Sequence, residues 1–319
     1  MSNTVDLSAI TSAASDLRKK ALASLGRSLI DLDDVIEKVM IAMIANGHVL
    51  LEGVPGTAKT TLCRTLALVL GLDFRRIQFT PDLLPSDVTG TRILDQANSV
   101  FVLQKGAIFC QLLLADELNR APARTQSALL EAMQENQVTI EGETLELPRP
   151  FIVLATQNPV EQEGVYRLPE AQLDRFLFRV NVGYPDRASE IRLLEIQETT
   201  PPVPEPFSTP EMILQMQSAV SQVYGKQEMK EYVVDLTRES RNHREVLLGA
   251  SPRAGIYLLK AARARALIHG KDYFSHEDVQ AVAHSVLEHR VIVRPEAELS
   301  GRSVTEIIDE VIRSVPIRN

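Results

Sequence analysis

The chain of 319 residues contains no tryptophan and only two cysteines, Cys63 and Cys110. Two isolated cysteines supply neither a disulfide framework nor the closely spaced Cys and His ligands of a zinc site. This usage is typical of a reducing compartment, so we expect a cytoplasmic protein. Nine phenylalanines and six tyrosines are too few to line a track on which single-stranded nucleic acid stacks.

Positive charge is also scarce, because 34 Lys and Arg stand against 42 Asp and Glu, for a net charge of −8. A protein that coats nucleic acid needs a basic stripe, so this balance argues against that class, although a local basic groove stays open. No apolar run approaches the roughly 18 residues of a transmembrane helix. The first residues show no basic segment followed by an apolar one. We therefore expect no membrane insertion and no signal peptide.

Short apolar runs alternate with helical patterns over the first 186 residues. Residues 1–14 are expected to be flexible, and apolar residues recur at helical spacing over residues 15–45. The alternation of strands with helices predicts a parallel five-stranded sheet between helices, an α/β fold. The expected strands are residues 48–52, 74–79, 112–115, 151–155 and 176–182.

Strand patterns stop after residue 186, and only helical patterns follow. Thr209 and Ser251 each precede a proline, which is the arrangement of an N-cap residue before the first helical position. Ser303 and Glu306 have the spacing of a capping box. We therefore expect an α/β domain over residues 15–186 and a smaller, all-helical domain over residues 187–319.

Residues 53–60, Gly-Val-Pro-Gly-Thr-Ala-Lys-Thr, follow an expected strand and open an expected helix. They match the phosphate-binding pattern GxxxxGK[ST] except at Ala58, which adds one methyl group. Backbone N–H groups at such a helix start form an anion cradle, Lys59 can reach the β- and γ-phosphates, and the Thr60 hydroxyl can ligate Mg²⁺. The alternative is a plain Gly/Pro turn. The expected nucleotide contacts here are Gly53, Val54, Pro55, Gly56, Thr57, Ala58, Lys59, Thr60 and Thr61.

Polar side chains follow the third and fourth expected strands. Asp116 and Glu117 end the third, at the edge where open α/β sheets bind ligands. Asp116 is expected to hold Mg²⁺, and Glu117 to act as general base on the water that attacks the γ-phosphate. Asn158 follows the fourth strand, where an amide can orient that water. The alternatives are an acidic helix cap for the carboxylates and a turn cap for Asn158.

Four segments together resemble the MoxR family of AAA+ ATPases, and the resemblance extends over residues 28–319. It implies a P-loop NTPase core with a helical lid, working as an ATP-hydrolysing ring that is commonly hexameric and whose active sites are shared between neighbours. By this resemblance Lys59, Thr60, Asp116 and Glu117 are the Walker A and B residues, and Asn158 is sensor 1. The segments read GVPGTAKT, LLLADELNRAPARTQSALLEAMQE, FIVLATQNP and LPEAQLDRFLFRV.

The resemblance also assigns roles to residues outside these motifs. Arg175, at a helix–strand junction, is expected to be an arginine finger that acts on the neighbour's ATP. Residues 249–254 resemble the sensor 2 motif, which makes Arg253 a γ-phosphate contact from the lid. The alternative for both arginines is a solvated surface residue. Leu29 and Ile30 are expected to contact adenine, at a place where family members often carry Gly-Gln.

The expectations about partners rest on two inserts in the α/β domain. By the resemblance, residues 83–108 are the helix-2 insert and residues 137–149 the hairpin before sensor 1, both near the pore of the ring; edge decoration is the alternative. Three aspartates stand against two basic side chains over residues 80–108, and four glutamates stand against one arginine over residues 135–149, which predicts a protein client and no nucleic acid. The resemblance further implies chaperone-like maturation or metal-cofactor insertion with a von Willebrand factor A domain partner.

Other function classes stay open on the sequence. One is a nucleic-acid motor on the same AAA+ scaffold, which needs basic or aromatic pore elements. Another is a magnesium-chelatase-like motor subunit, whose fold is closely similar. A third is an assembly switch that hydrolyses little ATP, and the intact Glu117 argues against it.

Overall fold

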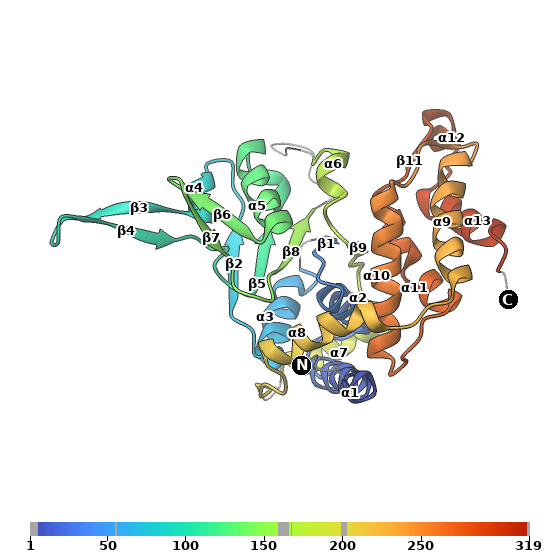
Figure 1. Cartoon of the computed structure of the whole chain (residues 1–319), viewed down its shortest axis with the longest axis horizontal. Helices are drawn as coiled ribbons and strands as arrows, with labels where there is room; N and C mark the ends of the chain where they lie inside the picture. The colour runs from blue at the N-terminus through green and yellow to red at the C-terminus, as the bar shows by residue number, and fades with distance from the viewer. Residues whose placement is uncertain (1–5, 55, 159–165, 167, 199–202, 318–319) are drawn as a thin grey trace.

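A computed structural model describes residues 6–54, 56–158, 166, 168–198 and 203–317. Figure 1 shows an α/β domain beside a mostly helical domain. The helices are α1 (Leu7–Leu25), α2 (Asp33–Ile44), α3 (Lys59–Leu70), α4 (Pro85–Thr89), η1 (Leu118–Arg120), α5 (Ala123–Glu135), α6 (Glu170–Leu173), α7 (Arg187–Gln197), α8 (Pro210–Ala219), η2 (Val220–Gln222), α9 (Gln227–Asn242), α10 (Pro252–Ile268), α11 (His276–Leu287), α12 (Pro295–Leu299) and α13 (Val304–Ser314). The strands are β1 (Val49–Glu52), β2 (Phe74–Gln78), β3 (Gly90–Asp95), β4 (Val100–Lys105), β5 (Leu112–Asp116), β6 (Gln137–Ile140), β7 (Glu143–Glu146), β8 (Ile152–Gln157), β9 (Phe178–Asn181), β10 (Val246–Leu248) and β11 (Ile292–Val293).

The central sheet has five parallel strands in the order β2-β5-β8-β1-β9. This confirms the predicted parallel sheet between helices. Strands far apart in the chain become neighbours: Leu50 of β1 lies opposite Ala155 of β8 on one side and Arg179 of β9 on the other. Because all strands run the same way, the carboxyl ends of β1, β5 and β8 meet at one edge of the sheet.

Successive residues of the inner strands pack on opposite faces, as the two-residue period of a strand requires. Leu51 and Leu114 join the cluster that contains the buried residues of α1, α2 and α3. Leu50 and Leu113 join the second cluster, with the buried residues of α5. Both faces are therefore covered by helices, which explains why these strands are continuously apolar.

The N-terminal region is more ordered than expected. Helix α1 begins at Leu7, so residues 7–14 are helical and the predicted flexible segment 1–14 was wrong over this part. The Asp6 side chain caps the helix by accepting the N–H groups of Ser8 and Ala9, and Ala14 is fully buried. The helical pattern over 15–45 also divides into two helices, α1 and α2.

The second domain is helical, as expected, but contains one pair of strands that the prediction of an all-helical domain missed. Strands β10 and β11 are antiparallel and only three and two residues long, too short to show a two-residue period. The Thr209 hydroxyl caps α8 by accepting the Met212 N–H, and Ser303 caps α13 in a capping box. Among the described residues, no helix is both long enough and apolar enough to cross a bilayer.

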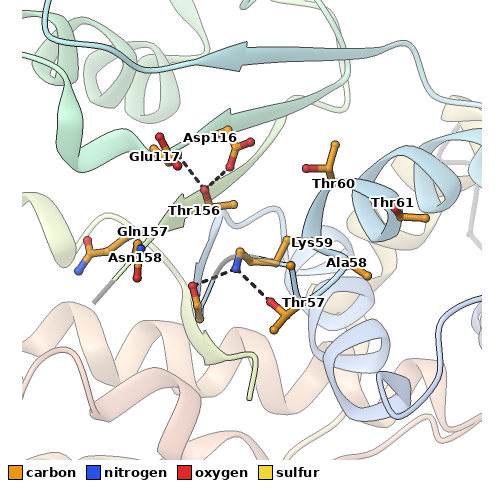
Figure 2. Close-up of a pocket in the computed structure, with 12 residues that line it drawn as sticks. Thr57, Ala58, Lys59, Thr60, Thr61, Asp116, Glu117, Thr156, Gln157 and Asn158 are labelled. Atoms are coloured by element: carbon orange, nitrogen blue, oxygen red, sulfur yellow. Dashed lines mark hydrogen bonds between the residues drawn. The ribbon is translucent and has the colours of Figure 1, made fainter. Parts of the chain in front are cut away.

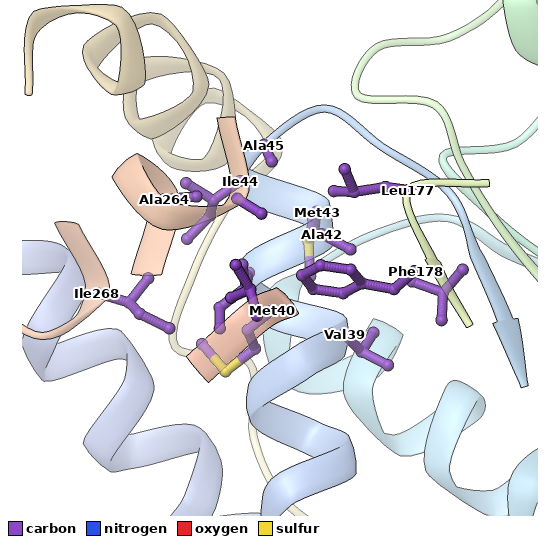
Figure 3. Close-up of a cluster of buried hydrophobic side chains, with 14 of the residues drawn as sticks. Val39, Met40, Ala42, Met43, Ile44, Ala45, Leu177, Phe178, Ala264 and Ile268 are labelled. Atoms are coloured by element: carbon purple, nitrogen blue, oxygen red, sulfur yellow. The ribbon is translucent and has the colours of Figure 1, made fainter. Parts of the chain in front are cut away.

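The helical domain and the core share one apolar cluster. Helix α10 lies against α1 and α2, and Figure 3 shows Met40 and Ile44 of α2 beside Ala264 and Ile268 of α10. Leu177 and Phe178, at the start of β9, complete this contact. The two domains are thus packed together through buried side chains.

Both predicted inserts form two-stranded hairpins. Strands β3 and β4 pair within the first insert, and β6 and β7 pair within the second. Figure 1 shows β3 and β4 extending far from the sheet. An ion pair between Arg92 and Glu143 joins the two hairpins. Leu94 and Phe101, which face each other near the outer end of the first hairpin, are 51% and 66% exposed.

Both cysteines are buried. Burial raises the pKa of the Cys110 thiol to about 12 and also raises that of Cys63. Cys63, in α3, belongs to the apolar cluster of the helices above the sheet. It therefore acts as a small apolar side chain, and a thiol in such a site is a poor nucleophile.

Candidate active site

The turn between β1 and α3 depends on small residues. A Cβ atom at Gly53 would lie 2.3 Å from the Val182 carbonyl oxygen, so a larger residue does not fit there. Gly56 has φ +87°, a conformation that glycine adopts easily. Pro55 lies outside the described residues. The turn brings the first N–H groups of α3 to the edge of the sheet.

Ala58, the position where the motif departs from the strict pattern, is the N-cap of α3 and is left-handed, with φ 56° and ψ 17°. This is why glycine is the usual residue of the pattern here. A left-handed alanine costs about 1–2 kcal/mol relative to the right-handed form. The surrounding structure holds the turn despite that cost, and α3 begins directly after it, at Lys59.

Lys59 starts α3 and turns back over the loop. Its Nζ donates to the carbonyl oxygens of Gly53 and Val54, at 2.9 and 2.7 Å, and to the Thr57 hydroxyl at 3.1 Å. Partial burial lowers the pKa of Lys59, and the charge of Asp116 opposes this change. The ammonium is thus held at the centre of the loop, where an anion bound by the helix N-terminus would meet it.

Asp116 is the last residue of β5, and Glu117 follows it in a left-handed conformation with φ 56°. Such a conformation is uncommon for a residue with a side chain and is found most often at functional sites. The Glu117 carboxylate accepts a hydrogen bond from Gln78 Nε2 at 2.6 Å and pairs with Arg120 at 3.1 Å. The two adjacent carboxylates are therefore held in different surroundings.

The structure adds three residues that the sequence analysis did not single out. Arg76 of β2 pairs with Asp116 at 2.7 Å and also donates to Gln78 at 2.7 Å. The Thr156 hydroxyl on β8 donates to Asp116 and accepts the Glu117 N–H at 2.8 Å. The two-residue period of β2 places Arg76 and Gln78 on one face, but only the strand order shows that this face lies beside the carboxylates.

These elements enclose one cavity of about 340 Å³ at the carboxyl edge of the sheet (Figure 2). Asn158 reaches it from the end of β8 and is 9% exposed. Val54 contributes its carbonyl oxygen to Lys59 but does not line the cavity. The predicted residues that line it are Gly53, Gly56, Thr57, Ala58, Lys59, Thr60, Thr61, Asp116, Glu117 and Asn158; Thr156 and Gln157 also line it.

The donors in this cavity fit a magnesium ion with a phosphorylated ligand. Thr60 offers a hydroxyl and Asp116 a carboxylate that is 14% exposed. Mg²⁺ prefers oxygen ligands and is usually held by one or two protein groups together with substrate phosphates. The described residues that line the cavity include one cation, Lys59, beside the helix start. The arrangement can therefore hold a phosphate chain, a divalent cation and a water near a carboxylate base.

A second cavity, of about 210 Å³, adjoins the first through Gly56, Thr57 and Ala58. Leu29 and Ile30 line it, as the expected adenine contacts should, and both are buried. Its other lining residues include Val182, Tyr184 and Leu193. Polar residues, among them Asp34 and Asn181, also line it, so the cavity offers both apolar contacts and hydrogen-bond partners, which suits a nucleotide base.

The two predicted arginines lie away from both cavities. Arg175 follows α6, and its carbonyl oxygen accepts a hydrogen bond from the Tyr257 hydroxyl at 3.5 Å. Arg253, in the first turn of α10, pairs with Asp174 at 3.6 Å and is 46% exposed. The structure thus brings the two arginines near each other, through Asp174, but not into the phosphate-loop cavity of their own chain.

Comparison with known proteins identifies relatives over nearly the whole chain. Residues 48–178 match the model of the ATPase family associated with various cellular activities (AAA), and residues 238–311 match the AAA lid domain. The two matches coincide with the α/β core and with most of the helical domain.

Two full-length relatives and one solved structure are similar. The chain is 46% identical to YeaC of Bacillus subtilis, over 93% of this chain and 94% of that protein. It is 42% identical to Chaperone MoxR1 of Mycobacterium tuberculosis, over 94% of this chain and 82% of that protein. A crystal structure of an ATPase from Cytophaga hutchinsonii superposes with a TM-score of 0.90 and 40% identity, covering 98% of each chain.

Proposed function

This chain belongs to the MoxR family of AAA ATPases, and we propose that it hydrolyses ATP as the motor of a ring that remodels a protein client. The observation that carries the proposal is the single cavity in which Lys59, Asp116, Glu117 and Asn158 meet. These residues come from three elements and supply a phosphate-binding cation, a metal ligand, a base and a water-orienting amide. The adjoining cavity, which contains Leu29 and Ile30, supports a nucleotide as the ligand.

The residues of the chain divide the chemistry between them. Lys59 and the N-terminus of α3 bind the phosphate chain and offset its charge. Thr60 and Asp116 would hold Mg²⁺, which when bound neutralises the developing charge on the phosphates. Glu117 accepts a proton from the attacking water, and Asn158 orients that water.

Hydrogen bonds around Glu117 support its role as base. Gln78 donates to its carboxylate and Arg120 pairs with it, so the side chain is already aligned at the mouth of the cavity. Asp116 is held separately, by Arg76 and Thr156. This separation lets one carboxylate serve a metal while its neighbour accepts a proton.

We further propose that Arg175 and Arg253 act on the ATP of an adjacent subunit. Neither arginine lines the cavities of its own chain, and both belong to the group of residues around Asp174. An arginine from a neighbour can stabilise the transition state without taking part in binding. The proposal therefore requires a homo-oligomeric ring, which we take to be a hexamer.

The client is proposed to be a protein. The hairpin of β6 and β7 carries Glu141, Glu143 and Glu146 and no lysine or arginine, and the neighbouring hairpin exposes Leu94 and Phe101. An acidic and apolar surface suits a protein segment and repels a phosphate backbone. The name of the relative Chaperone MoxR1 supports a chaperone-like role. We extend the same proposal to the maturation of the client, which includes metal-cofactor insertion. A partner with a von Willebrand factor A domain would take part in it.

A Glu117→Gln variant tests the proposal. We expect it to bind ATP with wild-type affinity but to lose about 10²–10⁴-fold in turnover, the usual contribution of a general base. Rings of this variant should retain bound ATP together with the client. Lys59→Ala should retain neither.

The matched control is Glu131→Gln, which neutralises an exposed glutamate of α5 and should leave turnover unchanged. Wild-type hydrolysis by Glu117→Gln would show that this carboxylate is not the base. Failure of both the wild type and Glu131→Gln to hydrolyse ATP would overturn the assignment of an ATPase.

A further inference from the structure

The backbone on both sides of Arg175 is held by the helical domain. The carbonyl oxygens of residues 174–177 all accept hydrogen bonds from it, although these residues belong to the core. Asp174 O accepts from Arg290 Nη2 at 3.0 Å, Arg175 O from the Tyr257 hydroxyl at 3.5 Å, Phe176 O from Arg290 Nη2 at 2.5 Å and His289 Nε2 at 3.1 Å, and Leu177 O from Arg290 Nη1 at 3.4 Å. Four successive peptide groups are thus fixed from outside their own domain.

Arg290 makes most of these contacts and is almost completely buried, with 2% of its side chain exposed. It comes from the connection between α11 and β11. Its Nε also donates to the Asp174 carboxylate at 2.7 Å, and its guanidinium lies 4.9 Å from the centre of the Tyr257 ring. A planar group with five N–H donors can bind a carboxylate and several carbonyls at once, whereas the ammonium of a lysine is a point charge with three donors.

Asp174 connects this group to the second arginine. Besides Arg290, its carboxylate contacts the Ser251 hydroxyl at 3.4 Å and Arg253 at 3.6 Å. Ser251 is the N-cap of α10, but its hydroxyl is directed to Asp174 rather than to the helix. The buried Arg290 therefore contacts Asp174, which precedes Arg175 in the chain and pairs with Arg253. Arg175 and Arg253 are the two arginines that are proposed to reach a neighbouring subunit.

We propose that Arg290 is a positioning residue for ATP hydrolysis, which sets the placement of Arg175 by clamping the backbone of residues 174–177. This inference rests on the proposed function, since it requires Arg175 to act on a neighbour's ATP. Arg290 does not line the nucleotide cavities of its own chain, so its effect reaches catalysis only through the residues that it holds. Misplacing a catalytic group by about 1 Å can cost roughly 100-fold in rate.

The test uses the full-length chain with Arg290→Lys, which keeps the charge and removes the planar fork. We expect kcat to fall about 10- to 100-fold, while the Kd for a fluorescent ATP analogue stays at the wild-type value. The double variant Arg175→Ala/Arg290→Lys should hydrolyse ATP as fast as Arg175→Ala alone, because Arg290 acts through Arg175. If Arg290 only stabilised the fold, the losses in kcat caused by the two single changes would multiply in the double variant.

Mixed rings supply a second readout. Lys59→Ala subunits cannot bind ATP tightly but keep an intact Arg175 segment, so mixing them with Arg290→Lys subunits should restore part of the activity.

The exposed Arg294, four residues further along the chain, gives the matched control: Arg294→Lys should keep the wild-type kcat. If Arg290→Lys does not fold, Tyr257→Phe replaces it, since this change removes only the hydroxyl at Arg175 O and should lower kcat about twofold, the effect of a long and weak hydrogen bond.

Three results would overturn the inference: wild-type kcat in Arg290→Lys, a further loss in the double variant, or no recovery in rings mixed with Lys59→Ala. For Tyr257→Phe, unchanged kcat, or an equal loss in the Arg175→Ala background, would overturn it. Mixing Arg175→Ala with Lys59→Ala serves as the reference. If that reference pair fails to recover activity in rings shown to be mixed, the shared active site is wrong, and the failure lies with the proposed function.

Discussion

The Thr156 hydroxyl on β8 donates a 2.5 Å hydrogen bond to the Asp116 carboxylate at the end of the adjacent strand β5. The same hydroxyl accepts the N–H of Glu117, whose backbone is left-handed. A single threonine therefore orients the proposed metal ligand and the turn that presents the proposed base. Neither contact is visible in the chain order, because Thr156 lies about 40 residues beyond both carboxylates.

Thr156→Val should weaken ATP hydrolysis. Valine keeps the shape of threonine but leaves Asp116 Oδ1 and the Glu117 N–H without this partner. A hydrogen bond to a charged group is worth about 1.5–3 kcal/mol, so we expect a loss of roughly 10- to 100-fold in kcat or in the apparent affinity for Mg²⁺. Titration of ATPase activity with Mg²⁺ measures both. Thr139→Val, at an exposed threonine of β6, is the control, and equal effects of the two changes would contradict the role of Thr156.

Lys59→Ala should abolish tight ATP binding, because Lys59 is the single cation of the phosphate loop, residues 53–60. Equilibrium binding of a fluorescent ATP analogue checks this, with circular dichroism to confirm folding. The fold should survive because the three hydrogen bonds of the ammonium lie within the loop itself. Wild-type affinity in a folded Lys59→Ala protein would show that the phosphates bind elsewhere.

Arg175→Ala should spare ATP binding and lower kcat, since the proposed finger belongs to the site of the next subunit. Arginine fingers contribute about 10³–10⁵-fold in other nucleotide hydrolases. Arg175→Ala and Lys59→Ala subunits should each be inactive alone and should regain some activity when mixed. An intact site can then take Lys59 from one subunit and Arg175 from another, so rings proven to be mixed but still inactive would refute a shared site.

DNA should not stimulate the ATPase at physiological salt. The hairpin of β6 and β7 is acidic and that of β3 and β4 exposes apolar side chains, whereas non-specific nucleic-acid binding comes almost wholly from cation–phosphate contacts. Phe101→Ser, at the exposed end of the first hairpin, should instead reduce stimulation by a protein client, and Thr139→Ser is a control on the other hairpin. A salt-sensitive, several-fold response to DNA that is lost on mutating either hairpin would favour the nucleic-acid motor.

The stability of the chain should fall in mild acid because of His48. Its Nδ1 accepts the Val153 N–H and its Nε2–H donates to the Met133 carbonyl, both at 3.0 Å. Burial lowers the pKa of His48 to about 4 from 6.5. Below pH 6.5 the unfolded chain therefore takes up a proton that the folded chain refuses, so the free energy of unfolding falls until the pH reaches about 4.

The size of this effect is about 3 kcal/mol over the whole range, at about 1.4 kcal/mol per pH unit and proton. Denaturant unfolding of the wild type and of His48→Gln at several pH values between 4 and 7 measures it. Glutamine offers both a donor and an acceptor but does not titrate, so the difference between the two proteins should shrink as the pH falls. A difference that is independent of pH would show that His48 is not the group responsible.

The sequence predicted the fold class correctly, and where its signal is local the residues that it singled out line one cavity in the structure. Residues 53–60 are contiguous, and their spacing alone determines a turn whose N–H groups open α3. Asp116, Glu117 and Asn158 were found because parallel strands place their carboxyl ends at one edge. The two-strand pair in the helical domain was missed since β10 and β11 are shorter than a recognisable pattern, and the start of α1 was missed because Ala14 and its neighbours look like a polar, mobile segment.

Only the tertiary structure decided the contacts that join distant parts of the chain. The strand order brings Arg76 and Thr156 to Asp116, although 40 residues separate each of them from it. The packing of α11 against β9 brings Arg290 to Asp174, across 116 residues of chain. The chain by itself determined the phosphate loop and the carboxylates, because their chemistry depends on consecutive residues and on a two-residue period. How those carboxylates are oriented, and what holds the backbone of Arg175, depends on which elements pack side by side, and that is decided by the burial of apolar surface over the whole chain.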